Sequence, residues 1–276
     1  MGQKTNPTIF SLSSATTEWK SKYIEKNVEE SSLLLHKNVK TRKYLDQVFK
    51  LHGLLIHSCK IQHNQTTATF LITFLNKKTK KSTNFVNNKK LINYLISDVL
   101  AVSINSYLKN KIVVFKTQNL SERFKRLIYC SRPLQYEYKN NLKLFKRFLK
   151  KPLFKELIYI LIVAISKRGS AKLIAETVSY CFTKQKKRHG FTLFILKKTL
   201  ETLTQSKLSV VKGIKIVITG RFNGAPRSNK KILIVDTVPL QSFDSIIDYY
   251  EDTAYTQNGT FGIKVWTCEK KKVQIF

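Results

Sequence analysis

Alternating apolar and polar residues organise the last third of the chain. Ile214, Ile216 and Ile218 recur at every second position, which places them on one face of an expected strand at 213–219. Turn residues separate this strand from three further runs, at 230–238, 243–250 and 261–268. The pattern predicts four strands in a sheet.

Two helices are expected before this sheet. Apolar residues from Ala171 to Cys181 recur at helical spacing directly after Ser170, a favourable N-cap residue. A basic break follows at 184–190, and a second amphipathic helix is predicted from about 191 to 203. Two helices followed by four strands indicate an α+β layer pair.

The first half of the chain predicts a smaller αβ module. Strands are expected at 54–61 and 67–75, followed by a basic loop at 76–82, a helical pattern at 91–100 and a buried strand at 112–115. Residues 119–168 break this order and look like an insertion, because they are rich in Lys, Phe and Leu and contain two prolines.

The expected fold class is therefore α+β, with a small αβ module followed by a C-terminal domain of two helices and a four-stranded sheet. We expect four segments: an N-terminal arm and helical segment at 1–50, the αβ module at 51–118, the lysine-rich insertion at 119–168, and the C-terminal domain at 169–276.

The chain carries a large excess of positive charge. Of 276 residues, 50 are Lys or Arg and 17 are Asp or Glu, for a formal net charge of +33. Like charges repel in a compact protein, so the excess indicates a polyanionic partner such as nucleic acid. Nine of the 50 basic residues are Arg, which leaves 41 Lys. Lysine binds phosphate as a point charge, which favours backbone binding over base reading; a merely solubilising surface is the alternative.

A membrane is the other polyanionic surface to consider. It would favour a basic amphipathic helix or an anchor, whereas these lysines are spread from end to end. The longest apolar run, 157–165, is about half the length needed to cross a bilayer. Residues 1–20 are polar and lack the pattern of a secretory signal. We expect no membrane span.

The cysteines and histidines indicate no cofactor or metal. Four cysteines are widely scattered, which fits a reducing compartment. The densest group, His52, His57, Cys59 and His63, has no zinc-site spacing, so we interpret these residues as ordinary strand residues.

No catalytic residue is expected either, because the chain has no nucleophile–base signature and no phosphate-binding P-loop. An organellar RNA-processing factor, such as an intron maturase or a homing nuclease, is the alternative from another class, and it requires clustered carboxylates for catalytic metals. Asp244, Asp248, Glu251 and Asp252 come closest to such a cluster. We interpret Asp248 as an intramolecular hydrogen-bond or ion-pair partner. A free RNA chaperone is a third possibility.

The segment 213–227 holds the best candidate RNA contacts. Gly220 and Gly224 bracket Arg221, so the backbone can turn tightly and approach a phosphate, and Arg227 follows in the same loop. Trp266 and Tyr249 are interpreted as packing residues rather than platforms for base stacking.

Several motifs in order resemble the universal small-subunit ribosomal protein S-three family. The resemblance rests on the start Met1-Gly-Gln-Lys-x-Asn-Pro7, on Arg42-x-Tyr44-Leu45, and on the C-terminal series Gly213-Ile-Lys, Gly220-Arg-Phe-x-Gly-Ala225, Val238-Pro-Leu240, Ile247-Asp-Tyr249 and Gly262-Ile-Lys-Val-Trp266. It covers 1–50 and 169–276 well and 51–118 loosely, and it leaves 119–168 without a counterpart.

This resemblance implies a structural component of the small ribosomal subunit, in its head near the mRNA entry channel, built around a KH domain. The implied partners are small-subunit rRNA, mRNA and neighbouring small-subunit ribosomal proteins. The chain departs from the family at the KH clamp, a GxxG loop, because the expected region from 75 to 90 contains no glycine. We therefore expect a degenerate KH-like module.

A second departure concerns the basic helix that faces mRNA in bacterial relatives. Its register falls near Phe191, and the positive charge here is displaced to either side, at 186–188 and 197–198. The candidate RNA-binding residues are these and the basic residues of the other motifs: Lys4, Arg42, Lys43, Lys186, Lys187, Arg188, Lys197, Lys198, Arg221, Arg227, Lys230 and Lys264.

The abundance of Lys, Asn, Ile, Phe and Tyr corresponds to A/T-rich codons. Together with the resemblance, it leads us to expect a mitochondrion-encoded protein that works in the matrix, within the mitochondrial ribosome.

Overall fold

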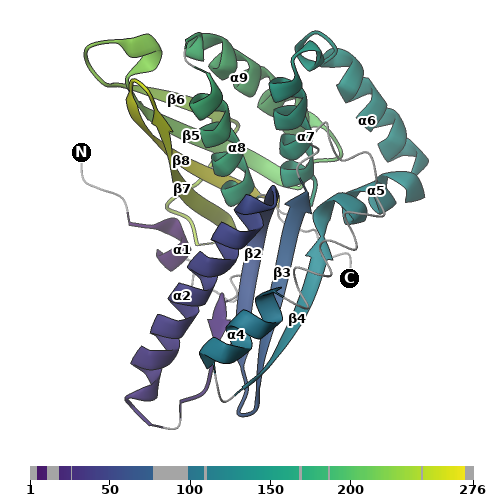
Figure 1. The fold of residues 1–276 in the computed structure, drawn as a ribbon. Helices are drawn as coiled ribbons and strands as arrows, with labels where there is room; N and C mark the ends of the chain where they lie inside the picture. Colours follow the sequence, from purple (N-terminus) through teal and green to yellow (C-terminus); the bar gives the residue numbers. More distant parts are fainter. Residues whose placement is uncertain are drawn as a thin grey trace. The chain divides into compact units, whose positions relative to one another are not determined.

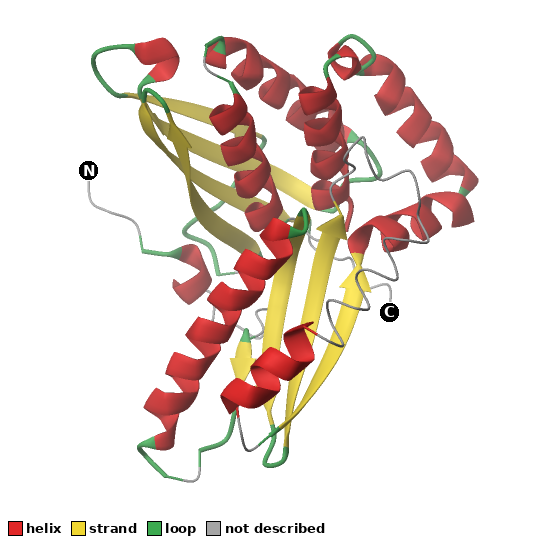
Figure 2. Cartoon of the chain, in the orientation of Figure 1, coloured by secondary structure: helices red, strands yellow, loops and turns green. Residues whose placement is uncertain are grey.

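The computed structural model describes residues 5–10, 19–25, 27–76, 99–108, 111–167, 170–185, 187–243 and 245–270 (Figure 1). The chain divides into two compact units. The N-terminal unit spans residues 19–123, and the C-terminal unit comprises residues 1–18 and 124–276. Each unit contains one four-stranded sheet and helices (Figure 2). The architecture is thus a mixture of α and β structure, as the sequence predicts.

The N-terminal unit is a mixed sheet covered by helices. Its strands are β1 (Ser21–Lys22), β2 (Leu54–His63), β3 (Thr67–Asn76) and β4 (Ile112–Asn119), in the order β1-β2-β3-β4. β2 and β3 form an antiparallel hairpin, whereas β4 runs parallel to β3. A parallel pair requires a crossover, and helix α4 (Ala101–Leu108) lies within it.

Helix α2 (Glu30–Leu51) packs on this sheet and completes its core. Leu45 and Phe49 on α2 are buried with Phe70 and Ile72 on β3. The division expected from the sequence separated residues 1–50 from the module at 51–118. The structure instead places α2 and the sheet in one unit, because the buried face of α2 covers the hairpin.

One expectation for this unit is wrong, and two others fall mainly on residues that the structure does not describe. The strand predicted as buried at 112–115 is an edge strand, and Ile112 is 66% exposed while Val113 and Phe115 pack on the core. Side chains alternate between the two faces of a strand, so Val113 and Phe115 lie on the face that packs on the core, whereas Ile112 and Val114 lie on the opposite, exposed face. The basic loop at 76–82 and most of the helical pattern at 91–100 lie outside the described residues.

The C-terminal unit has three layers. Its antiparallel sheet contains β5 (Val211–Gly220), β6 (Asn229–Val235), β7 (Ile247–Thr256) and β8 (Gly259–Glu269), in the order β6-β5-β8-β7. Helices α8 (Ala171–Lys184) and α9 (His189–Gln205) pack on one face of it, α8 on β7 and β8 and α9 on β5 and β6. Helix α7 (Pro152–Lys167) packs against both helices.

The expected strands and helices are present here with shifted ends. The run predicted at 243–250 begins and ends later, at Ile247 and Thr256, and the run predicted at 230–238 ends at Val235. The N-cap at Ser170 is confirmed, since its hydroxyl oxygen accepts a hydrogen bond from the Leu173 amide at 3.2 Å.

The segment 119–168 is part of the C-terminal unit from position 124 onward. It forms α5 (Leu120–Cys130), α6 (Arg132–Leu144), the short 3-10 helix η2 (Phe148–Lys150) and α7. Every residue from 157 to 165 except Tyr159 is buried. An almost uniformly apolar helix must be covered on most sides, and α7 lies in a layer against α8 and α9. This burial explains the apolar run, and no helix among the described residues is long and apolar enough to span a bilayer.

One short helix lies near the start of the chain. α1 (Pro7–Phe10) packs on β7, and Asn6 begins it by accepting hydrogen bonds at its side-chain oxygen from the amide and the hydroxyl of Thr8. Pro7, the last residue of the opening motif, thereby lies in a helix that packs on the C-terminal sheet, and residues 1–4 of the motif lie outside the described residues.

Candidate nucleic-acid interface

A reciprocal pair of hydrogen bonds joins two basic segments that are distant in the sequence. The backbone amide of His189, at the start of α9, donates to the side-chain oxygen of Asn223 at 3.0 Å. In return, the backbone amide of Asn223 donates to Nδ1 of the His189 ring at 3.0 Å. The α8–α9 turn, which carries Lys187 and Arg188, therefore lies beside the β5–β6 loop, which carries Arg221 and Arg227.

An aromatic cluster holds the His189 ring in place. The ring is 1% exposed and stacks on Phe182 with centroids 5.2 Å apart, while Phe222 and Phe261 meet it edge-on. Gly220 makes room for this cluster, because a Cβ at that position would lie 2.3 Å from the Phe261 ring. The glycine expected to permit a tight turn is required here for close packing.

The β5–β6 loop is shaped by its own backbone. Asn223 and Gly224 adopt left-handed conformations, with φ of 57° and 80°. The 3-10 helix η3 (Phe222–Gly224) closes with a hydrogen bond from the Ala225 amide to the Phe222 carbonyl. Arg221 donates its Nε–H to the Ala225 carbonyl at 2.8 Å, which fixes the direction of its side chain.

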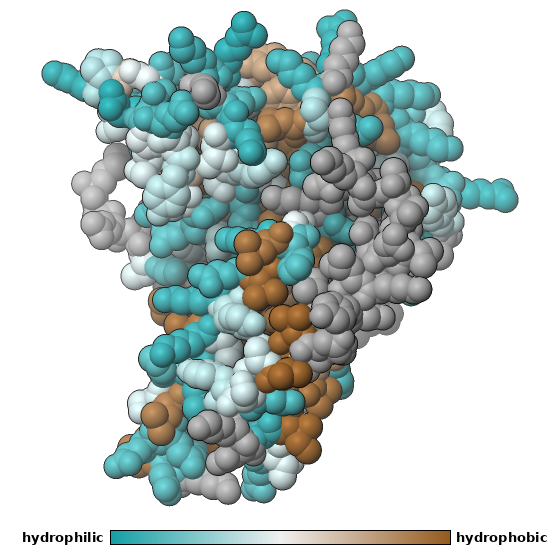
Figure 3. Space-filling view, viewed as in Figure 1, coloured by the Kyte–Doolittle hydropathy of each residue, from teal (hydrophilic) through white to brown (hydrophobic). Residues whose placement is uncertain are grey.

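We call Lys187, Arg188, Arg221 and Arg227 the basic rim. All four side chains are exposed. Of their side-chain nitrogen atoms, only Nε of Arg221 has a hydrogen-bond partner among the described residues. No acidic residue occurs in the segments 184–190 and 220–231. Hydrophilic side chains line the end of the C-terminal unit to which these loops belong (Figure 3). A water-exposed group of unpaired cations is suited to phosphate.

The other candidates are dispersed. Lys197 and Lys198 are exposed on α9, roughly two and a half turns of helix after Arg188, and the Lys197 ammonium lies 3.8 Å from the Glu201 carboxylate. Lys230 is exposed on β6, close in sequence to Arg227. Lys43 is exposed on α2 in the N-terminal unit. Lys4 and Lys186 lie outside the described residues.

Arg42 has a structural role that its motif does not reveal. Its guanidinium donates to the carbonyl oxygens of Cys59 and Lys20, at 2.8 and 2.6 Å, and to the hydroxyl of Ser21 at 2.8 Å. It thus holds the short strand β1 on β2. These bonds occupy the planar fork that would otherwise bind phosphate.

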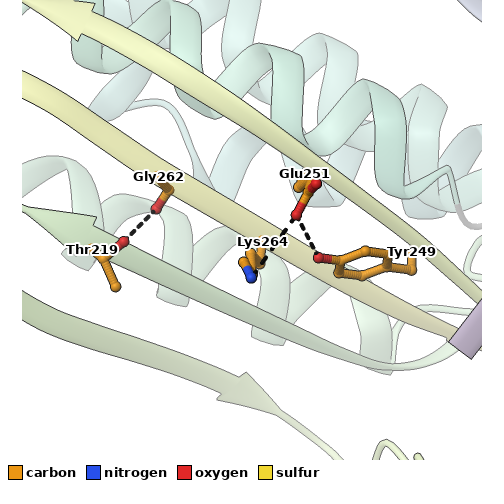
Figure 4. A network of polar contacts seen from close by, with 5 residues as sticks. All are labelled: Thr219, Tyr249, Glu251, Gly262 and Lys264. Atoms are coloured by element: carbon orange, nitrogen blue, oxygen red, sulfur yellow. Dashed lines mark hydrogen bonds and ion pairs between the residues drawn. The ribbon is translucent and has the colours of Figure 1, made fainter. Parts of the chain in front are cut away.

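The sheet face opposite α8 and α9 has a separate polar network (Figure 4). Tyr249 donates its hydroxyl to Glu251 at 2.9 Å, and the Lys264 ammonium lies 3.9 Å from the same carboxylate. Burial, together with the hydrogen bond to Glu251, raises the pKa of Tyr249 to about 12, so its hydroxyl remains a donor. An acidic neighbour makes Lys264 a weaker phosphate contact than the rim residues.

Aromatic residues on this face pack on one another. The rings of Tyr249 and Trp266 lie 5.1 Å apart, and the Lys215 ammonium lies 5.5 Å from the Trp266 ring. Trp266 and Tyr249 thus pack on each other and are half-buried, and their interpretation as packing residues rather than stacking platforms stays a prediction.

The acidic residues of β7 are divided between the two faces of the sheet. Asp248 accepts from the Ala171 amide at 2.9 Å and so caps α8, as the predicted intramolecular role requires. Asp252 accepts from the Ser179 hydroxyl at 2.5 Å, whereas Glu251 lies on the opposite face. Asp244 lies outside the described residues. The described carboxylates therefore point to different partners rather than to one metal.

The histidines and cysteine of the first hairpin do not converge. His63 is buried, and its Nε2 lies 2.7 Å from the side-chain oxygen of Asn38. Burial, with the nearby charges of Lys111 and Lys37, lowers the pKa of His63 to about 4. In the part of the chain that the structure describes, no group of three or more His, Cys, Asp or Glu residues is placed to hold a metal.

Sequence reasoning missed His189 and Asn223. Nothing in the local pattern distinguishes His189 from the basic residues before it, and Asn223 reads as an ordinary turn residue. Their partnership spans 34 positions, so only the packing of α9 on β5 brings them together.

Comparison with known proteins agrees with the motifs. Residues 195–267 match the family described as "Ribosomal protein S3, C-terminal domain". The chain is 30% identical over 269 residues to small ribosomal subunit protein uS3c of Tupiella akineta, which covers 96% of this chain and 97% of the relative. It is 26% identical over 268 residues to uS3c of Euglena longa, covering 96% and 99%.

A bacterial relative matches a smaller part. The chain is 36% identical over 99 residues to uS3 of Fusobacterium nucleatum subsp. nucleatum, which covers 36% of this chain and 42% of the relative. The long matches to the uS3c proteins span nearly all of the chain, so they include most of the segment 119–168 that the motifs leave unmatched. This chain belongs to the uS3 family of small-subunit ribosomal proteins, whose role is structural rather than enzymatic.

Proposed function

We propose that this protein binds small-subunit rRNA through the basic rim and helps to hold the folded rRNA in the small ribosomal subunit. Family membership supports a structural role in the subunit. The observation that carries the RNA contact is the reciprocal pairing of His189 and Asn223, which makes one cationic surface from two separate segments. Isolated lysines elsewhere add attraction without a fixed geometry.

The finer position in the subunit follows from the family resemblance. We place the protein in the head, near the mRNA entry channel, beside neighbouring small-subunit proteins. There Lys187 and Arg188, with Lys186, Lys197 and Lys198, would contact the backbone of rRNA or of incoming mRNA. Reversing the charges at Lys187 and Arg188 should impair translation of structured messages. Unchanged translation of such messages would show that these residues do not act on mRNA.

We also propose that the N-terminal unit is a degenerate KH domain. An antiparallel hairpin whose second strand pairs in parallel with β4 across a helical crossover supports this. The missing glycine clamp argues for coarse electrostatic contact through the lysines at 77, 78, 80 and 81, rather than for a gripped single strand.

The ribosome concerned is proposed to be organellar. The A/T-type composition supports the mitochondrion, whereas the uS3c relatives leave another organelle equally open. Fractionation of organelles with an antibody to this chain distinguishes them.

The deciding experiment is sedimentation. The wild-type chain should cofractionate with small subunits, and the triple variant Arg188→Gln/Arg221→Gln/Arg227→Gln should shift toward the top of a sucrose gradient as salt rises. A matched variant, Lys22→Gln/Lys40→Gln/Lys116→Gln, removes the same charge from exposed positions of the N-terminal unit. Equal loss in both variants would show that net charge alone matters, and no loss in either would refute the proposed rim.

Metal-dependent RNA or DNA cleavage tests the RNA-processing alternative. We expect none, because Asp248 and Asp252 are used to hold α8.

A further inference from the structure

The ring of His189 is buried yet fully engaged at both nitrogens. Nδ1 accepts the Asn223 amide at 3.0 Å, so it carries no proton. Nε2 lies 3.1 Å from the carbonyl oxygen of Gln185, which can only accept, so Nε2 carries the proton and donates it. The geometry thus requires the neutral Nε2–H tautomer.

The residues on either side of this contact have unusual backbones. Among the described residues, three that are not glycine have positive φ: Arg188 at 68°, Asn223 at 57° and Asp236 at 56°. Two of the three meet at His189. Left-handed backbone is unfavourable for a side chain such as arginine and persists only where the surroundings enforce it. Such residues concentrate at functional sites.

The left-handed turn at Arg188 has a direct consequence for the rim. Arg188 immediately precedes α9, so its conformation sets the direction in which the basic turn enters the helix. Asn223 lies two residues after Arg221, and its conformation closes the loop on which Arg221 is fixed by the Ala225 carbonyl. His189 therefore contacts the loop that carries Arg221 through both its ring and its backbone amide, and it directly follows Arg188 in the chain.

We propose that His189 is the positioning residue of the basic rim: as a neutral Nε2–H imidazole paired with Asn223, it holds Arg188 and Arg221 in one fixed relation, so that they engage the same RNA backbone. This inference rests on the proposed function, since it assumes that the rim binds RNA. It adds that RNA affinity depends on the relation between the two segments and not only on their charges.

The test uses the full chain and a fluorescein-labelled RNA hairpin of about 16 base pairs, the length that a double-stranded RNA-binding surface can span. Affinity is measured from low to high KCl, because the slope of log K against log salt counts the phosphates neutralised, at about 0.9 per phosphate for duplex DNA. A loss of positioning should lower both the affinity and the slope.

Four single variants separate positioning from packing. His189→Phe keeps an aromatic ring but removes the acceptor, and Asn223→Gly keeps the positive φ but removes the side-chain oxygen. For both we expect affinity about 5- to 10-fold lower and a slope reduced by about one phosphate. His189→Asn restores an acceptor near Nδ1 and should bind within about 2-fold of wild type.

The matched control is Phe182→Leu, which disturbs the same aromatic cluster and leaves the hydrogen bonds. It should lower thermal stability and leave the salt slope unchanged. If Phe182→Leu loses as much RNA affinity as His189→Phe, general packing accounts for the effect and the positioning role is overturned. If His189→Phe does not fold, Asn223→Gly decides, because Asn223 is exposed and Gly tolerates its backbone.

Two further outcomes distinguish this inference from the proposed function. If the triple rim variant loses affinity while His189→Phe and Asn223→Gly bind normally, the rim stands and the positioning role falls. If the triple variant itself binds normally, the proposed function fails. Nitrogen chemical shifts of ¹⁵N-histidine, assigned with His189→Asn, should show the Nε2–H tautomer at position 189, and an Nδ1–H or doubly protonated ring would overturn the inference.

Discussion

The two units share one feature, helices packed on a four-stranded sheet, and use their arginines in opposite ways. In the N-terminal unit, the Arg42 guanidinium donates hydrogen bonds to three oxygen atoms and holds β1 in place. In the C-terminal unit, Arg221 gives only its Nε to the loop and remains exposed. Whether an arginine in a family motif is available for binding therefore depends on which of its donors the fold has already used.

The largest effect should come from removing Arg42. Arg42→Met leaves two carbonyls and a hydroxyl without their partner, and we expect a loss of about 3 kcal/mol in local stability, since hydrogen bonds from a charged donor contribute about 1.5–3 kcal/mol each and solvent can replace part of them. Amide hydrogen exchange of peptides covering β1 and β2 measures this.

The control for that prediction is Lys43→Met at the next, exposed position, which should change exchange very little. If Arg42→Met instead weakens RNA binding with exchange unaltered, the contrast between the two arginines is wrong.

Gly220→Ala should destabilise the C-terminal unit more than any single substitution in the basic rim. The added Cβ would lie 2.3 Å from the Phe261 ring, and crowding of a packed core costs about 1–3 kcal/mol. Thermal unfolding of the C-terminal unit, followed by near-ultraviolet signals of its aromatic residues, should show the loss. Gly190→Ala is the matched control, because nothing lies within 4 Å of its Cβ and alanine favours a helix; it should be neutral or slightly stabilising.

Acid should loosen the N-terminal unit through His63. The folded unit keeps the pKa of His63 at about 4, below its ordinary value of 6.5, so the unfolded chain takes up the proton first. The stabilisation from neutral His63 is complete above pH 6.5 and is lost as the pH falls from 6.5 toward 4, by on the order of 2 kcal/mol.

Hydrogen exchange of β2 and β3 between pH 7 and 4.5, corrected for the intrinsic rate, checks this titration. His63→Gln keeps a donor toward Asn38 and cannot titrate, so it should flatten the difference. An equal pH dependence in His63→Gln would assign the effect to other groups.

Arg221→Gln should have the smallest effect of the four, and on affinity alone. Losing one phosphate contact is expected to weaken binding of an RNA hairpin by about 1 kcal/mol and to lower the salt slope by about one. The melting temperature should stay within about 2 °C of wild type, because the side chain is exposed. A large fall in the melting temperature would place Arg221 with Arg42 as a structural residue.

The spacing of apolar residues and the positions of turn-forming residues predicted most of the strands and helices. The strands near 54, 67, 213, 230 and 261 and the helices on either side of 184–190 follow from apolar spacing alone, with ends that shift by a few residues. The strand at 243–250 was placed too early, since the apolar residues before Ile247 belong to a loop. The segment 119–168 was interpreted as an insertion because it is rich in Lys, Phe and Leu and contains two prolines, whereas it includes the helix α7, which packs in the interior.

The candidate site was only half predictable. Glycine spacing and charge identify Arg221 and Arg227, and the run 186–188 identifies Lys187 and Arg188. That these two segments lie side by side could not be predicted from the sequence, because their contact depends on a buried histidine and an asparagine 34 positions apart. Arg42 is the opposite case, since its motif led us to expect an RNA contact. Its guanidinium instead donates to two backbone carbonyls, and these contacts could not be predicted from the sequence pattern.

The sequence by itself determined the charge, the family motifs and the alternation that builds each sheet, because these depend on residue type and on local spacing. Only the tertiary structure decided which cations act together. Pairing across long loops depends on how α9 packs on β5 and on which donors remain after the backbone has been satisfied. A hydrogen bond between distant residues is a property of the folded chain, and the basic rim exists only there.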